Sequence, residues 1–183
     1  MNGFISKLDQ SVDLSRVINE IRSLLDFKIG WEPENQIGLR HRAGSEHPWK
    51  DSVGGLWDRE GNVRMASESD FSVWHQDCPT YTKQVLEELA AKEKINWGRV
   101  RFMRSLPKTG LSMHTDDEPR YHLVLWTNPS AIFGECYKNN VIRSICYHIP
   151  ADSYWYKVDT TREHFVYNGG WSPRVHLVAC PCI

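Results

Sequence analysis

The feature that most constrains the fold is a series of short β-type segments in the second half of the chain. Seven such runs are separated by Pro, Gly, Asn and Asp, at residues 98–105, 120–127, 131–136, 144–148, 153–158, 164–167 and 174–180. Short strands divided by turn residues are typical of antiparallel sandwiches and barrels rather than of βαβ units. We therefore expect a mainly β protein with an antiparallel core.

Two amphipathic helices are predicted ahead of this region. In residues 11–27 the apolar side chains recur at three- and four-residue steps, with Ser11 or Asp13 as the N-cap. Residues 79–94 show the same periodicity, and Pro79 is compatible with a first helical turn. Between them, glycines and prolines divide residues 30–71 into short strands and loops, of which 35–42 is the best strand candidate. We expect both helices to flank the β core.

Charge and apolar patterning exclude several classes of function. The 22 Lys+Arg nearly balance the 23 Asp+Glu, so the chain lacks the basic surplus that binding to a phosphate backbone requires. The first 26 residues lack the apolar core and cleavage site of a secretory leader, and no apolar run of about 18 residues follows. Five cysteines without a repeated spacing favour a reducing compartment, and Cys180 with Cys182 supplies only half of a structural zinc site. We expect a soluble cytoplasmic protein with neither nucleic acid nor membrane as a partner.

The side chains that carry chemistry are centred on His114-Thr115-Asp116. In an extended segment alternate residues point to the same side, so His114 and Asp116 can reach one ion. Two neutral imidazoles and one carboxylate form a facial triad that leaves three coordination positions open, as in non-haem Fe(II) oxygenases. The triplet therefore predicts a metal site that needs one further histidine.

The downstream candidates for that histidine are His122, His148, His164 and His176. The pattern favours His164, because its segment turns at residues 168–170 and returns through Arg174 on a neighbouring antiparallel strand. Arg174 would then present a planar, permanently charged group to a carboxylate held beside the metal. We expect a site that joins a metal to an anchored carboxylate.

These residues resemble the Fe(II)/2-oxoglutarate-dependent aspartyl/asparaginyl β-hydroxylase family, which includes bacterial amino-acid hydroxylases such as the proline hydroxylases. The resemblance runs roughly from Arg99 to Ala179 and rests on residues 101–105, 107–110, 114–116, 120–123, 163–164 and 174–177. It implies a double-stranded β-helix, the jelly roll of the cupins, with flanking N-terminal helices. The animal members carry glycine in place of the carboxylate ligand, so Asp116 makes the chain more similar to the bacterial members.

The resemblance implies a dioxygenase that uses Fe(II), 2-oxoglutarate and O₂ to hydroxylate an unactivated C–H bond of an amino acid or peptidyl residue. His114, Asp116 and His164 would be the catalytic iron ligands and Arg174 the anchor of 2-oxoglutarate. Arg120 and His122 would line the cosubstrate pocket. Residues 1–183 would form one domain, in which 1–96 supply helices, strands and substrate loops and 97–183 form the β-helix with the metal and cosubstrate site.

Arg40, His41 and Arg42 lie outside the resemblance, in a region where such enzymes place substrate-binding loops. Clustered arginine and histidine can bind an acidic or amino-acid substrate, and the alternative is ordinary surface charge on a loop. Two other functions fit the motif residues. One is a non-catalytic β-barrel module that binds a metal or a small acid. The other is a cupin-type metal isomerase or thiol dioxygenase, which would rely on three histidines and leave Asp116 without a role.

Overall fold

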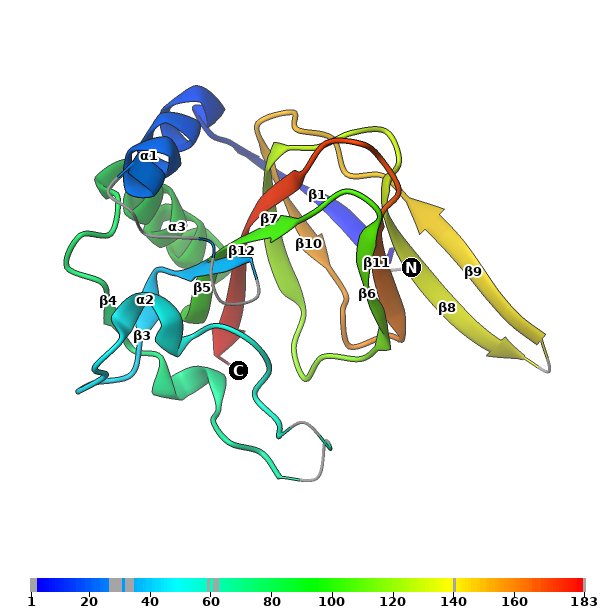
Figure 1. Cartoon of the computed structure of the whole chain (residues 1–183), viewed down its shortest axis with the longest axis horizontal. Helices are drawn as coiled ribbons and strands as arrows, with labels where there is room; N and C mark the ends of the chain where they lie inside the picture. The colour runs from blue at the N-terminus through cyan, green and yellow to red at the C-terminus, as the bar shows by residue number, and fades with distance from the viewer. Residues whose placement is uncertain are drawn as a thin grey trace. The chain divides into compact units, whose positions relative to one another are not determined.

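The computed structural model describes residues 3–26, 31, 35–58, 60, 63–139 and 141–182. It divides into two compact units, of which unit 1 comprises Met1–Val12 and Arg104–Leu177, and unit 2 comprises Asp13–Met103 and Val178–Ile183 (Figure 1). The elements in chain order are β1 (Ile5–Ser11), α1 (Leu14–Asp26), β2 (Gln36–Gly38), β3 (Arg40–His41), α2 (Pro48–Asp51), the 3₁₀ turn η1 (Glu68–Asp70), β4 (Val73–Trp74), α3 (Thr80–Glu93), β5 (Asn96–Ser105), β6 (Thr109–His114), β7 (Arg120–Trp126), β8 (Ala131–Asn139), β9 (Val141–Tyr147), β10 (Tyr154–Val158), β11 (His164–Asn168) and β12 (Arg174–Cys182).

Unit 1 is built from two antiparallel sheets. In one sheet β1, β10, β7 and the first residues of β12 are neighbours in that order, and in the other the order is β6, β11, β8 and β9. Their facing sides share one buried core cluster, to which β7 contributes Val124, β8 Phe133, β10 Val158 and β11 Val166. Four strands of a six-stranded sheet, packed in this way on a second sheet of four strands, form a jelly roll. The predicted mainly β, cupin-like fold is confirmed.

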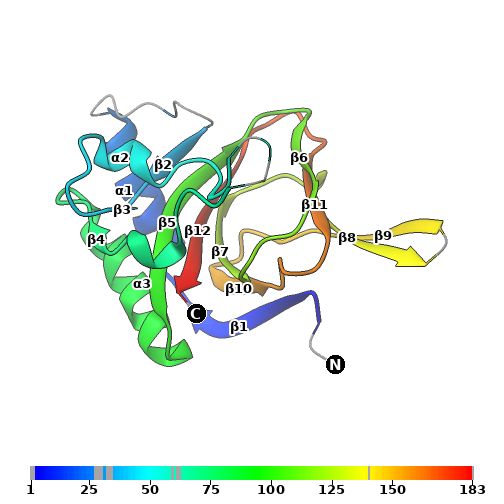
Figure 2. The same ribbon diagram turned by 90° about the horizontal axis from the view of Figure 1, so that it is seen from below.

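The hairpin of β8 and β9 extends beyond the other strands of its sheet (Figures 1 and 2). Its pairing runs from Phe133 opposite Tyr147 to Asn139 opposite Val141. At the base of the hairpin Gly134 lies opposite Phe165 of β11. A Cβ on Gly134 would lie 2.0 Å from the Phe165 ring, so only glycine lets this ring cover the backbone of β8.

All seven predicted β runs form strands, and three further strands, β1, β4 and β6, were not predicted. The strand β1 precedes the first predicted helix, overlaps it only at Ser11, and pairs with β10. Of the two predicted N-caps, Asp13 is the one observed, because its Oδ1 accepts a hydrogen bond from the Arg16 N–H at 3.2 Å. The missed strand β6 ends at His114, so Asp116 lies in the loop that follows rather than on the strand.

In unit 2 the two predicted helices are confirmed as α1 and α3, which lie side by side (Figures 1 and 2). The helix α1 buries one face through Val17, Ile21 and Leu24. Glu20 on α1 accepts hydrogen bonds from the N–H groups of Tyr81 and Thr82 at 2.9 and 2.8 Å. Those donors belong to the first turn of α3 and have no partner within that helix, so Glu20 joins the two helices.

The predicted strand 35–42 is divided into β2 and β3. The strand β2 pairs with β5, whereas β3 pairs with β4. Between them the Leu39 N–H donates to Val100 O at 2.7 Å, and Leu39 O accepts from the His75 N–H at 2.9 Å. The segment therefore changes partner at Leu39, which local propensity could not show.

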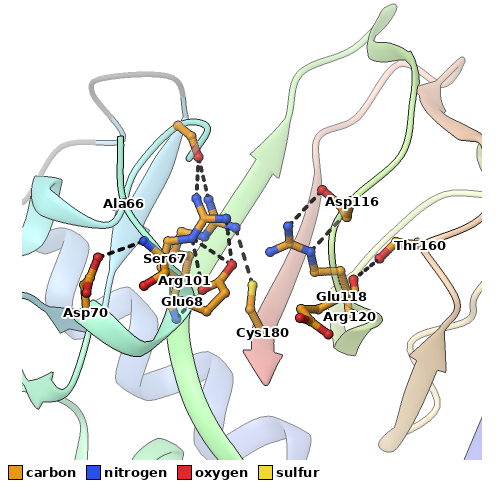
Figure 3. A network of polar contacts seen from close by, with 12 residues as sticks. Ala66, Ser67, Glu68, Asp70, Arg101, Asp116, Glu118, Arg120, Thr160 and Cys180 are labelled. Carbon is orange, nitrogen blue, oxygen red and sulfur yellow. Dashed lines mark hydrogen bonds and ion pairs between the residues drawn. The ribbon is translucent and has the colours of Figure 1, made fainter. Parts of the chain in front are cut away.

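A buried charged cluster fastens η1 to β5 in unit 2 (Figure 3). Arg99 forms an ion pair with Glu68, with Nη2 2.8 Å from Oε1. Arg101 donates to Gly54 O at 3.1 Å and contacts Cys180 Sγ at 3.7 Å. Cys180, one of the two C-terminal thiols, is thus buried beside an arginine.

None of the described helices combines the length and the apolar character needed to cross a bilayer.

Candidate metal centre

Three side chains of unit 1 converge where β6 and β11 pair. His114, the last residue of β6, lies directly opposite His164, the first residue of β11, and their ring centroids are 4.3 Å apart. Asp116 follows in the next loop, with Oδ2 3.9 Å from His164 Nε2. One ligand atom from each of the three residues lies within 4.8 Å of the other two. The register between β6 and β11 brings the two histidines together, and the loop after β6 adds Asp116, so the three residues form a two-histidine, one-carboxylate set.

The orientation of both imidazoles is fixed by backbone carbonyls. His114 Nδ1 lies 2.7 Å from Ser112 O, and His164 Nδ1 lies 2.9 Å from Arg162 O. A carbonyl can only accept, so each Nδ1 carries a proton, and the neutral form of either ring then has its lone pair on Nε2. Burial, the largest influence, lowers the pKa of His164 and keeps that ring neutral. The two rings thus offer Nε2 in the state that metal ligation requires.

Asp116 is held as a carboxylate by Arg120. Arg120 Nε donates to Oδ2 at 3.0 Å and Nη2 donates to Oδ1 at 2.8 Å (Figure 3). Burial alone would raise the pKa of Asp116, but Arg120, with smaller contributions from His114 and His164, outweighs it and lowers that pKa. The loop is fixed by Thr160, whose O accepts from the Asp116 N–H at 2.8 Å and whose hydroxyl donates to Glu118 O at 2.7 Å.

Arg174, the predicted cosubstrate anchor, is buried in unit 1 with its guanidinium over the Phe133 ring, 4.7 Å from the centroid. Burial lowers its pKa to about 9. Its Nε donates to His176 Nε2 at 2.8 Å, and among the described residues no carboxylate pairs with it. His122, which lies 3.2 Å from His176 between Nδ1 atoms, has a buried Nε2 without a hydrogen-bond partner in the described part of the chain. Among the described residues, Arg174 therefore lacks a carboxylate partner and His122 Nε2 lacks any hydrogen-bond partner.

Residues 13–180 match the family model of the aspartyl/asparaginyl β-hydroxylases. The chain belongs to this family. No protein of curated function matches it in a sequence comparison. The family membership supports an oxidoreductase that hydroxylates its substrate.

Solved structures show that this β-hydroxylase family member shares its fold with oxygenases. An oxidoreductase of the 2OG-Fe(II) oxygenase family from Burkholderia pseudomallei is 14% identical with a TM-score of 0.56, and the match covers 97% of this chain and 84% of that one. A prolyl-4-hydroxylase from Pseudomonas putida is 12% identical with a TM-score of 0.52, covering 98% of this chain and 92% of that one.

Glu135 and Arg162, which support the site in this family member, were not identified from the sequence. Glu135 of β8 lies opposite His164 in the sheet and is 1% exposed. It forms an ion pair with Arg162, whose carbonyl orients His164, and accepts a hydrogen bond from the Tyr147 hydroxyl at 3.1 Å. A carboxylate two residues after Phe133 in the otherwise apolar run 131–136 was the available signal, because alternate strand residues share a face.

The predicted substrate-binding residues of this family member lie in unit 2 and have partners there. Arg40 Nε and Nη2 donate to the carbonyls of Phe71 and Ser72 at 3.0 and 2.8 Å. Arg42 is paired with Asp51, with Nη2 2.6 Å from Oδ1. His41 Nδ1 lies 2.8 Å from Arg42 O. Both arginines are thus held by hydrogen bonds or an ion pair within unit 2. Their role in substrate binding stays a prediction.

Proposed function

We propose that the protein is an Fe(II)- and 2-oxoglutarate-dependent dioxygenase that hydroxylates a C–H bond of an amino acid or peptidyl residue. One observation carries this proposal: a two-histidine, one-carboxylate set shares a jelly roll with a buried arginine, Arg174, that no described carboxylate pairs with, and with His122, whose buried Nε2 has no partner among the described residues. His122 lies within electrostatic range of Asp116 and His164 as well as of Arg174, so it bridges the two parts.

The donor set fits Fe(II). His114 and His164 both offer Nε2 in fixed orientations, and Asp116 is ionised. Two imidazoles and one carboxylate suit a facial triad with open positions, whereas sulfur-rich sets suit zinc or iron–sulfur clusters. Arg120 would keep Asp116 oriented while one carboxylate oxygen binds the ion, in the way that surrounding hydrogen bonds usually tune ligands.

The buried groups fit a dicarboxylate. A buried guanidinium without a counter-ion is costly, and a ligand carboxylate would remove that cost through charge-assisted hydrogen bonds. Arg174 would bind the carboxylate distant from the metal, and His122 would contribute a second polar contact. Phe133, packed against both Arg174 and His122, would exclude water from that side. Anchoring by Arg174 would fix the position of the keto acid at the other end.

When bound, iron and 2-oxoglutarate would supply the oxidising chemistry: O₂ and 2-oxoglutarate yield succinate and CO₂, and the second oxygen atom converts C–H into C–OH. The chain contributes geometry. Its residues hold the ion and cosubstrate in one arrangement and surround them with buried side chains. Asp116 and the family membership favour free amino acids, followed by peptides, as substrates to screen. From the sequence we retain the expectation of a cytoplasmic location and of Arg40, His41 and Arg42 as substrate contacts.

The test of the ligand set is anaerobic addition of Fe(II) and 2-oxoglutarate. The wild type should develop the weak visible charge-transfer band of the chelate, and His114→Ala should not, because one ligand is lost. His47→Ala, which alters an exposed histidine of unit 2, is the matched control and should retain the band. A normal band in His114→Ala would refute the ligand assignment.

Turnover separates the dioxygenase from a binding module. With Fe(II), O₂ and a panel of amino acids and peptides, substrate-stimulated formation of succinate supports the oxygenase. Tight binding of 2-oxoglutarate with no succinate from any member of the panel would favour a non-catalytic module instead.

A further inference from the structure

Arg174, His176 and His122 form a continuous polar chain inside unit 1. Their exposed fractions are 7%, 2% and 5%. Arg174 Nε lies 2.8 Å from His176 Nε2, and His176 Nδ1 lies 3.2 Å from His122 Nδ1. The Phe133 ring packs against all three side chains. These three side chains therefore have little access to water, and each polar proton on them must lie between protein atoms.

The protons on the two histidines can be assigned by starting from Arg174, which is a donor only. A guanidinium only donates, so His176 Nε2 must be the unprotonated nitrogen that accepts from Arg174 Nε. The single proton of a neutral His176 then lies on Nδ1 and points to His122. His122 Nδ1 must accept it, which leaves the proton of His122 on Nε2.

One further contact tests this assignment. Arg174 Nη2 lies 3.1 Å from His176 Nδ1, so a hydrogen bond there would require the reverse tautomer. That tautomer would bring two N–H groups together at the shorter contact of 2.8 Å, between Arg174 Nε and His176 Nε2. The shorter contact therefore determines the tautomer. Burial, together with the charge of Arg174, lowers the pKa of both histidines, in keeping with two neutral rings.

His122, the last residue of this hydrogen-bonded series, is a buried donor. His122 Nε2 has no partner among the described residues, and by this assignment it carries a proton. A buried N–H without an acceptor is unfavourable, so the atom calls for a ligand oxygen. Arg174 and Arg120 each act on this ring more strongly than Asp116 does, which favours an anionic oxygen over a neutral one.

We propose that His176 is a positioning residue, which accepts from Arg174 and donates to His122 so that His122 presents Nε2–H to a carboxylate oxygen of the bound ligand. The ligand class, a dicarboxylate such as 2-oxoglutarate, rests on the proposed function. The relay itself rests only on the contacts between the three side chains. With the opposite tautomer, His122 would direct a lone pair at the carboxylate and repel it.

Two substitutions of His176 separate the relay from simple packing. The side-chain amide in His176→Gln has an oxygen that can accept from Arg174 and an N–H that can donate to His122, so it retains the direction of the relay. His176→Phe fills the space but has neither group. Histidine ¹⁵N–¹H correlation spectra of the metal-free protein report the tautomer directly, and His122→Gln identifies the His122 signals by their loss.

We expect His122 in the Nε2–H form in the wild type and in His176→Gln, and loss of that preference in His176→Phe. On the zinc-loaded protein, which is redox-inert, His176→Phe should weaken 2-oxoglutarate binding by about 10- to 100-fold in calorimetry, the range for one hydrogen bond to a charged group. His176→Gln should stay within about threefold of wild type, and zinc affinity should be unchanged in both.

The outcomes that overturn the inference differ from those that overturn the function. An Nδ1–H form of His122 in the wild type would refute the relay, whatever binds. Equal 2-oxoglutarate affinity in His176→Phe and wild type would refute the positioning role. An Nε2–H form of His122 together with no binding of 2-oxoglutarate to the zinc-loaded wild type would refute the proposed cosubstrate and leave the proton assignment standing.

Discussion

Glu135→Ala is the substitution that best tests how the metal ligands are held. In the structure Glu135 pairs with Arg162, and the carbonyl of Arg162 accepts from His164 Nδ1 at 2.9 Å. Removing the carboxylate frees the Arg162 side chain and loosens the carbonyl that orients His164. Glu135 also accepts from the Tyr147 hydroxyl, so that hydrogen bond is lost as well. Both stability and metal affinity should therefore fall.

The size of the effect follows from the exposure of the two partners. Removing one partner of a fully buried ion pair costs about 3–5 kcal/mol. The Glu135 side chain is 2% exposed, but that of Arg162 is 36% exposed and can turn to water, so the lower end applies. We expect the free energy of unfolding to fall by about 3 kcal/mol, equivalent to about 6–12 °C in Tm for a chain of this size. Loss of ligand orientation should weaken zinc binding by about 10- to 100-fold.

Urea unfolding of the metal-free protein and competitive zinc titration measure the two effects separately. Glu135→Gln is the informative comparison, because it retains the shape and the acceptor for Tyr147 while removing the charge, and it should lie between wild type and Glu135→Ala in both assays. Glu46→Ala changes an exposed carboxylate of unit 2 and should alter neither. If Glu135→Ala lost stability but bound zinc as tightly as wild type, the support of His164 through Arg162 would be refuted.

Three further predictions concern pH, packing and the cosubstrate. His122 and His176 have folded-state pKa values well below 6.5, so the unfolded chain binds more protons, and unfolding in urea should show stability falling by about 1.4 kcal/mol per pH unit for each as pH drops below 6.5. Gly134→Ala should destabilise by about 1–3 kcal/mol, measured by thermal unfolding, because its Cβ meets the Phe165 ring. Arg174→Lys should weaken 2-oxoglutarate binding to the zinc-loaded protein by about tenfold or more in calorimetry, because lysine cannot form the planar pair.

Each of these predictions has a matched control and a contrary outcome. His176→Phe should remove the contribution of one histidine to the pH slope, and an unchanged slope would show that burial does not hold that ring neutral. Gly55→Ala has no atom within 3.8 Å of the new Cβ and should be mild, so an equal loss at Gly55 and Gly134 would contradict the packing argument. Arg143→Lys, an exposed change on β9, should leave 2-oxoglutarate affinity intact, and an equal loss there would remove the special role of Arg174.

The local patterns of the sequence determined the strand-rich core and both helices. Alternation and turn residues located the seven strands, since each run carries its own signal. The spacing of His114, Asp116 and His164 predicted their convergence correctly, because a histidine that begins a strand can pair with one that ends its neighbour. Asp116 itself lies beyond β6, which ends at His114, and its N–H donates to Thr160 O, which positions the loop.

Only the tertiary structure decided what surrounds those ligands. Glu135 meets Arg162 and His176 meets His122 through strand register, which depends on hydrogen bonds between segments distant in sequence. The bidentate contact of Arg120 with Asp116 likewise needs the turn between them. Sequence spacing shows which residues can reach a metal, whereas the orientation of each imidazole and the placing of each proton depend on long-range contacts that only the folded chain forms.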